Sequence, residues 1–156
     1  RTTIFDYWNV DTIARWRNKD KFDGKLLEKD EKELYHFYTR LLNLCKQEKS
    51  IYDGQFFDLM YVNYENWNFN QHKQYAFLRK KDNEVLLIVV NFDEIPAHIG
   101  INIPAHALEF LGIPPREHQQ VIDLLTGKAE RIDFLPDHAV QTDVEGFNGK
   151  ILKFTF

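Results

Sequence analysis

The sequence predicts a mainly β protein, in which an antiparallel, Greek-key-like β-sandwich follows an N-terminal helical segment. Apolar side chains recur at three- and four-residue steps between residues 34 and 45, which indicates an amphipathic helix. After Gly54 their period changes to two, and short strand-like runs separated by turn signals follow about every 8–12 residues. Hydrophobic residues make up 44% of the 156 residues. A chain of this length buries about 70% of its surface on folding, so we expect a sizeable core.

The helical segment comes first. After an aromatic, loop-like start at residues 1–8, a short helix is predicted at residues 10–16, and a polar loop follows at residues 19–29. The clearest helix begins at Asp30, the expected N-cap, with Glu33 at capping-box spacing. One face of this helix is apolar, and that face contains Leu34, Phe37, Tyr38, Leu41, Leu42, Leu44 and Cys45.

Strands occupy most of the remaining sequence. Two alternating runs, residues 75–79 and 85–92, flank a turn at residues 81–83 and predict a β-hairpin. A helical turn is predicted at residues 105–111, just before two prolines. The other strands are predicted at residues 55–62, 95–103, 121–125, 129–134, 139–144 and 150–156.

Charge and hydropathy argue against two classes of partner. The 20 Lys and Arg residues against 24 Asp and Glu leave a net charge of −4. Because phosphate contacts need clustered cations, we expect no nucleic-acid partner. The longest apolar run is residues 85–90, far short of the about 18 residues that a membrane helix needs, so we expect no membrane partner.

The familiar catalytic and metal-binding motifs are absent from the sequence. The six histidines lack H-x-x-x-H and H-E-x-x-H spacing, and a single cysteine excludes a zinc finger, so we expect no metal site. Glycine-rich phosphate loops and the G-x-S-x-G motif are also missing, so we expect no cofactor. Cys45 falls on the apolar helix face, where a buried, inert thiol is the preferred interpretation.

One stretch suggests a binding surface. Residues 61–70 alternate aromatic rings with side-chain amides, and Tyr64, Trp67 and Phe69 are the candidate rings. Rings can stack on sugar faces while amides bond to hydroxyls, so this stretch is a candidate carbohydrate platform. The structural alternative, which we prefer at this point, is a loop whose rings plug one end of the sandwich.

Five segments in their order and spacing resemble the C-terminal part of α-amylase-type enzymes of glycoside hydrolase family 13. Residues 1–8 resemble the segment after the last strand of the catalytic barrel, and residues 34–44 resemble the final barrel helix. Residues 75–80 and 85–92 are similar to the hairpin that opens the C-terminal β-sandwich of these enzymes, and residues 123–127 (DLLTG) are similar to a later turn. The resemblance spans nearly the whole chain.

The resemblance implies a role for each part of the chain. Residues 1–52 would be the tail of a catalytic (β/α)8 barrel, including its last helix, and residues 53–156 would be the accessory C-terminal β-sandwich domain. Arg1, Asp6 and Trp8 would then lie on the side where such barrels bind substrate, and loop packing is the alternative.

No catalytic residue of the family can be carried over. The G-x-R-x-D pattern of its nucleophile and its N-H-D motif are absent, and Asp137-His138 has the wrong order. The acid/base Glu of the family lies upstream of the equivalent of Arg1. The missing initiator Met and the strand at the C-terminus also lead us to expect a fragment.

The sequence therefore leaves three functional hypotheses. The first is a noncatalytic C-terminal domain of an α-glucan-acting hydrolase, which stabilises its catalytic barrel. The partners would then be the barrel of the same parent chain and α-glucan through that parent. The second is an independent carbohydrate-binding module, and the third is a stand-alone enzyme of unknown type. In an isolated fragment, the apolar face of the long helix would drive a self-association without biological role.

Overall fold

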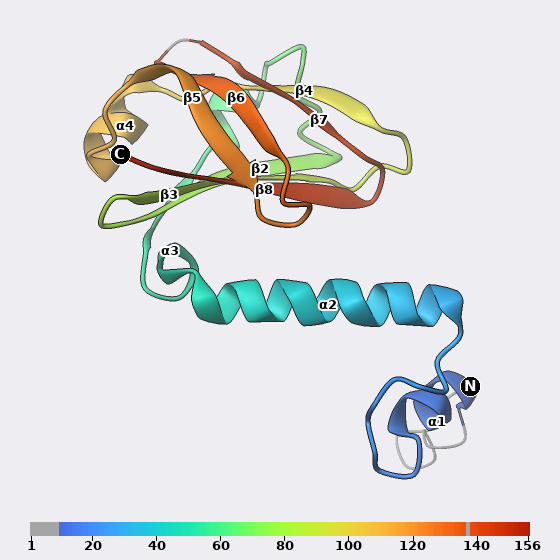
Figure 1. Cartoon of the computed structure of the whole chain (residues 1–156). Coiled ribbons are helices and arrows are strands. Elements are labelled where there is room, and N and C mark those ends of the chain that lie inside the picture. Colours follow the sequence, from blue (N-terminus) through green and yellow to red (C-terminus); the bar gives the residue numbers. More distant parts are fainter. Residues whose placement is uncertain (1–9, 137) are drawn as a thin grey trace. The chain divides into compact units, whose positions relative to one another are not determined.

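The computed structural model describes residues 10–136 and 138–156 (Figure 1). The chain forms two compact units, residues 1–44 and residues 45–156, and helix α2 (Lys29–Gln47) runs across their boundary. The first unit is helical where it is described, and the second is mostly β, which confirms the predicted fold class. No helix in the described ranges is long and apolar enough to cross a membrane.

In the first unit, an ion pair joins helix α1 (Asp11–Arg17) to the start of α2. Arg15 Nε donates to Glu31 Oε2 at 2.9 Å, and Arg15 Nη2 donates to the other carboxylate oxygen. Glu31 Oε2 also accepts the backbone N–H of Glu28 at 2.9 Å. Glu31 thereby satisfies one of the amides that a helix start leaves without a partner inside the helix.

The predicted cap of the long helix was wrong. Helix α2 begins at Lys29, so Asp30 lies in its first turn and not at the N-cap. Glu31 reaches back to the amide just before the helix, which is the role that the sequence pattern assigned to Glu33. Several acidic residues lie close together here. The ion pair with Arg15, which belongs to another helix, distinguishes Glu31 from the others.

Helix α2 is amphipathic as predicted, but none of its residues is buried. Leu34 and Leu42 are more than half exposed, and Cys45 is only partly covered. The expectation that Cys45 is a buried thiol is therefore wrong in this structure. Self-association through the apolar face of α2 stays a prediction.

The second unit is a two-layer antiparallel sandwich (Figure 1). A large sheet of six strands has the order β1-β2-β3-β8-β5-β6, and a small sheet pairs β4 with β7. A short helix α3 precedes β1, the 3-10 turn η2 follows it, and helix α4 follows β4. The elements are α3 (Lys49–Tyr52), β1 (Gln55–Asp58), η2 (Tyr61–Asn63), β2 (Gln74–Lys81), β3 (Glu84–Asn91), β4 (Ala97–Ile101), α4 (Ala105–Leu111), β5 (Arg116–Asp123), β6 (Ala129–Phe134), β7 (Val140–Val144) and β8 (Asn148–Thr155).

One hydrophobic core lies between the two sheets. Alternate residues of each strand point inward, so Leu87 and Leu152 of the large sheet share a buried cluster with Ile99 and Val140 of the small sheet. Helix α4 adds Leu108 and its neighbours to the same cluster. The small sheet and α4 therefore cover the inner face of the large sheet.

The outer face of the large sheet is also apolar. By strand register, Phe77, Ile88 and Ile151 form one row across β2, β3 and β8, and none of the three belongs to the inner core. Phe56 lies beside Phe77, with ring centroids 5.4 Å apart, and is 45% exposed. Tyr75 extends the same ring cluster at 5.6 Å from Phe77. Ile88 and Ile151 are buried, and charged residues lie at one end of the same face, so the exposed apolar part of the outer face is the ring cluster on β1 and β2.

Helix α3 is tied to one end of that outer face. Ser50 donates its backbone N–H to Glu84 Oε1 at 2.9 Å and its hydroxyl to the Glu84 carbonyl at 3.0 Å. Lys153 Nζ pairs with Glu48 at 2.5 Å and with Glu84 at 2.9 Å. Burial alone would lower the pKa of Lys153, but its bonds to both carboxylates outweigh burial and raise it. Burial would likewise raise the pKa of Glu84, but Lys153 and Ser50 lower it.

Two strand boundaries differ from the prediction by four residues or more. The strand predicted over residues 55–62 ends at Asp58, whose side chain accepts the backbone N–H of Met60 at 2.9 Å and turns the chain into η2. The strand predicted at residues 121–125 begins earlier, at Arg116, because pairing with β6 extends it. The predicted hairpin is confirmed as β2 and β3, which pair over their full length.

The ion pair at the start of α2 gives a titration prediction. The Arg15 guanidinium holds the pKa of Glu31 at about 2, below its ordinary 4.5. Because the folded pKa is the lower one, Glu31 stabilises this helix start fully above about pH 4.5 and loses that effect as the pH falls toward 2. NMR titration of the Glu31 carboxyl should show its pKa rising toward 4.5 in Arg15→Ala. An unchanged pKa would contradict this role of Arg15.

Candidate functional site

The candidate rings lie in the loop between η2 and β2. Trp67 is completely exposed, at 101% of its reference area, and Tyr64 is also exposed. Phe69 is 5% exposed and belongs to the core, so its assignment to a sugar platform was wrong and the packing alternative holds for it. The other predicted site residues, Arg1, Asp6 and Trp8, lie outside the described residues.

The amides of this loop hold the loop together. The fully buried Asn63 donates from Nδ2 to the carbonyls of Leu59 at 2.8 Å and Asn102 at 3.1 Å, and its Oδ1 accepts the Asn102 N–H at 2.8 Å. Asn66 Nδ2 donates to Asn63 Oδ1 at 2.8 Å and to the Gly100 carbonyl at 2.7 Å. Asn63 and Asn66 therefore serve the fold and are not available to a ligand.

The same bonds fix the loop along the edge of the small sheet. Gly100 of β4 donates its N–H to the Asn68 carbonyl at 2.9 Å, while its own carbonyl accepts from Asn66. Strand β4 pairs only with β7 in the sheet, so the loop covers its other edge. Trp67 lies between two residues that are both bonded to Gly100. Its backbone is thus anchored on each side while its ring points into solvent.

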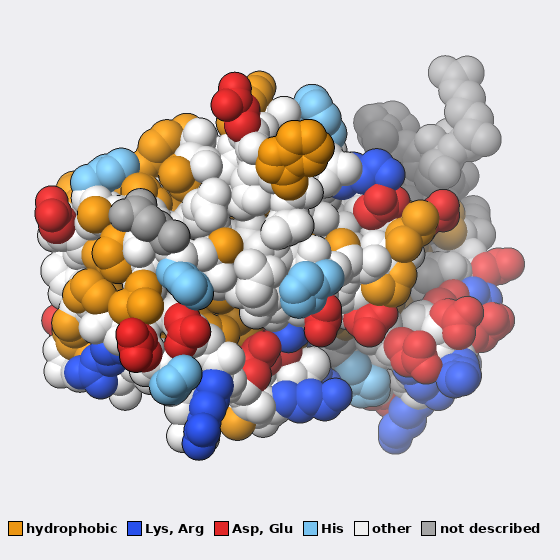
Figure 2. Space-filling view, turned by 90° about the horizontal axis from the view of Figure 1, so that it is seen from above, with side chains coloured by type: hydrophobic (Ala, Val, Ile, Leu, Met, Phe, Trp, Pro, Cys, Tyr) orange, Lys and Arg blue, Asp and Glu red, His pale blue; other side chains and the backbone are white. Residues whose placement is uncertain are grey.

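The outward face of the small sheet lies beside this loop. The residues that alternate with the core positions are His98 opposite Asp143, and Gly100 opposite Gln141, and all of them except Gly100 carry polar side chains. His98 Nδ1 lies 2.7 Å from Asp143 Oδ1, and both side chains are mostly exposed. A Cβ on Gly100 would lie 2.9 Å from Gln141 Nε2 and 3.1 Å from Asn68 Cβ, so the absence of a side chain at Gly100 lets the loop approach β4 closely. The view from above in Figure 2 shows a broad uncharged area on this side of the molecule.

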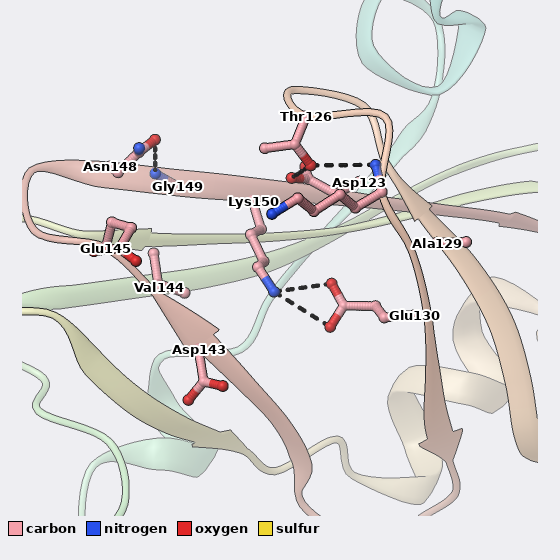
Figure 3. A pocket seen from close by; sticks show the side chains of 11 residues that line it. Asp123, Thr126, Ala129, Glu130, Asp143, Val144, Glu145, Asn148, Gly149 and Lys150 are labelled. Atoms are coloured by element: carbon pink, nitrogen blue, oxygen red, sulfur yellow. Dashed lines mark hydrogen bonds and ion pairs between the residues drawn. The ribbon is translucent and has the colours of Figure 1, made fainter.

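A separate cavity of about 360 Å³ opens between the β5–β6 and β7–β8 turns (Figure 3). Lys150 reaches across it and donates to Glu130 Oε1 at 2.9 Å and to Thr142 Oγ1 at 2.9 Å. Lys150 and Glu130 inside the cavity are therefore already paired with each other. Its lining consists of Asp123, Thr126, Lys128, Ala129, Glu130, Asp143, Val144, Glu145, Asn148, Gly149 and Lys150.

The DLLTG segment has a structural role next to this cavity. Asp123 is buried; its Oδ1 accepts the backbone N–H of Leu125 at 3.1 Å and of Ile151 at 3.2 Å, and its Oδ2 accepts the Thr126 hydroxyl at 2.6 Å. Asp123 thus closes the β5–β6 turn and ties it to β8. Within residues 10–136 and 138–156, no group of three or more His, Cys, Asp or Glu could hold a metal ion.

No protein family and no curated protein matches the chain by sequence. Solved structures match it. The noncanonic maltogenic α-amylase AmyB from Thermotoga neapolitana has a TM-score of 0.60 and 15% identity, over 83% of this chain and 27% of that chain. AmyP in complex with maltose has a TM-score of 0.59 and 17% identity, over 85% and 23%. The α-amylase from Geobacillus thermoleovorans, complexed with acarbose, has a TM-score of 0.56 and 12% identity, over 86% and 26%.

The fold is that of part of an α-amylase. The resemblance found in the sequence segments is confirmed at this level. The chain spans about a quarter of the length of these α-amylases, which agrees with a C-terminal portion of such an enzyme. At these identities the likeness concerns the fold, so activity and ligands need separate arguments.

Sequence reasoning found the exposed rings and missed the polar sites. Tyr64 and Trp67 stood out because rings and amides alternate, and they remain candidate binding residues. The cavity contacts of Glu130, Thr142 and Lys150 come from three different strands, and no spacing in the sequence signals them. For the outward polar face of the small sheet, the only signal in the sequence was the alternation at residues 97–101.

The loop network gives a stability prediction. Asn63→Ala leaves the buried groups of Leu59 and Asn102 without their partner and should cost about 2–3 kcal/mol of unfolding free energy. Trp67→Ala should change stability by less than about 0.5 kcal/mol, because the ring buries nothing. Urea denaturation of both variants tests this. Equal midpoints for the two variants would contradict the assigned role of Asn63.

Proposed function

We propose that this chain is the noncatalytic C-terminal part of an α-amylase-type glycoside hydrolase, and that its sandwich stabilises the catalytic barrel. One observation carries the proposal: a partly exposed cluster of aromatic rings, Phe56 with Phe77 and Tyr75, lies on the outer face of the large sheet, the face away from the small sheet. Among proteins with this fold, a larger catalytic part accompanies the matching segment, since the match takes only about a quarter of their length.

The chemistry of the outer face suits a permanent protein contact. Phe56, Tyr75 and Phe77 form a continuous ring cluster, and Ile88 and Ile151 extend it across the sheet. Burying a large apolar side chain is worth about 1.5–3 kcal/mol relative to exposure. Ile88 and Ile151 are already buried, so the partly exposed rings around Phe56 are the part of this face that would gain most from a partner. The catalytic barrel of the same parent chain is that partner in our proposal.

The N-terminal residues fit the same proposal. Residues 1–52 would be the tail of the barrel and residues 53–156 the accessory sandwich. The unburied apolar face of α2 would then pack against the outside of the strand barrel, as the helices of a (β/α)8 barrel do. Arg1, Asp6 and Trp8 would lie near the substrate cleft.

The fold relatives support a proposal for the substrate class. Two of them are structures with maltose or acarbose, so we propose that the parent acts on α-glucans. This chain would reach that substrate through its parent, because retaining hydrolysis needs two positioned carboxyl groups and the sequence motifs for both are missing here.

A second candidate function is an independent carbohydrate-binding module. The exposure of Trp67 on an anchored loop is the observation that favours it. The two functions are compatible, since they use opposite faces of one sandwich.

The first test concerns activity. The purified chain should release no sugar from starch or maltoheptaose above a blank, because it lacks the family motifs for nucleophile and acid. A reducing-sugar assay measures this. Activity that persists through repurification would refute the proposed noncatalytic role.

The second test concerns the outer face. In the full-length protein, Phe56→Asp should place a charge in the barrel contact and cost about 2–4 kcal/mol, lowering the Tm of the enzyme by several degrees. In the isolated chain the same change should be nearly neutral, since Phe56 is 45% exposed there. Trp67→Asp, on the opposite layer, is the matched control and should change neither Tm. An equal response of full-length protein and isolated chain to Phe56→Asp would contradict the contact.

A further inference from the structure

We infer that the outward face of the small sheet, together with Trp67, is a binding platform for a linear α-glucan. The α-glucan class rests on the proposed function, whereas the existence of the platform rests on the geometry of the loop and sheet. The ring, the neighbouring sheet face and the direction in which that face points each support it.

Trp67 is an exposed ring on an anchored loop. It is the most exposed large hydrophobic side chain in the described ranges, and its removal from water would be favourable. Its neighbours Asn66 and Asn68 are both bonded to Gly100, and Phe69 anchors the loop in the core. The ring is therefore held out from the domain by a well-bonded base. Little ordering entropy remains to be lost when a flat ligand stacks on it.

The neighbouring sheet face supplies polar groups in a flat array. Gln141 lies opposite Gly100, next to the anchored loop, and the His98–Asp143 pair follows along the same two strands. An amide, an imidazole and a carboxylate offer both donors and acceptors, which is what sugar hydroxyls require. Gly100 adds no side chain that would rise above this surface. Strand faces of small β domains bind oligosaccharides in the same manner, with few polar groups that fix orientation.

The platform lies on the layer away from the proposed barrel contact. The core separates the small sheet from the large sheet, so their outward faces point in opposite directions. A barrel on the large sheet would leave Trp67 open to solvent. Figure 2 shows no concentration of Lys and Arg around the uncharged area on this side, which favours a neutral ligand over a polyanion. The cavity at Lys150 is a poorer candidate, because the Lys150 ammonium group already bonds to Glu130 and Thr142.

NMR titration of the chain with maltoheptaose tests the inference. The sequence has three tryptophans, so the indole N–H region is simple, and the signal missing from Trp67→Ala identifies Trp67. Maltoheptaose should shift that signal and the backbone amides of Gly100 and Gln141. Trp67→Ala should weaken binding at least about tenfold, and Trp67→Tyr should retain part of it.

Phe110→Ala is the matched control, because Phe110 is a mostly exposed ring on helix α4. It should bind maltoheptaose like the unmodified chain. No shift at millimolar maltoheptaose, or equal binding by Trp67→Ala, would overturn the inference and leave the proposed barrel contact untouched. Equal shifts with cellohexaose would overturn the α-glucan class, and with it a support of the proposed parent, while the barrel contact is judged by the Phe56→Asp experiment.

Discussion

The structure depends on how the two faces of the six-stranded sheet are covered: a two-stranded sheet and helix α4 close the inner face, whereas the outer face keeps a partly exposed ring cluster around Phe56. The inner face has Leu87 and Leu152 in a closed core. The outer face has Phe77 and Ile88 in the same strands, at positions where a solvated sheet would carry polar residues. The exposed rings are the feature on which the proposed contact with a larger partner rests.

Polar contacts hold two segments, helix α3 and the loop at residues 61–70, against the sandwich. Lys153, held between Glu48 and Glu84, fixes helix α3 at the base of the outer face. Asn63 and Asn66 fix the long loop against the free edge of β4. Both sets of bonds are well buried or partly buried, so they specify position as well as stability. The partly exposed rings of β1 and β2 and the polar outward face of the small sheet lie on opposite sides of one core.

The sequence predicted what depends on local patterning. The β2–β3 hairpin and helix α2 follow from periodicity alone, and their positions are nearly right. The capping residue of α2 could not be predicted, because Arg15 on another helix selects Glu31 among several neighbouring acids. The residues 61–70 were recognised as unusual, but only tertiary contacts separate Phe69, which enters the core, from Trp67, which faces solvent. Long-range partners are invisible in a single sequence.

Hydroxyl-radical footprinting of the full-length protein beside the isolated chain tests the central claim most directly, because it labels both open faces in one experiment. The account predicts that Phe56 and Tyr75 are labelled in the isolated chain and protected in the full-length protein, whereas Trp67 is labelled equally in both. Equal labelling of Phe56 in the two proteins, or protection of Trp67 in the full-length protein, would contradict the assignment of the large sheet to the barrel and of the small sheet to solvent.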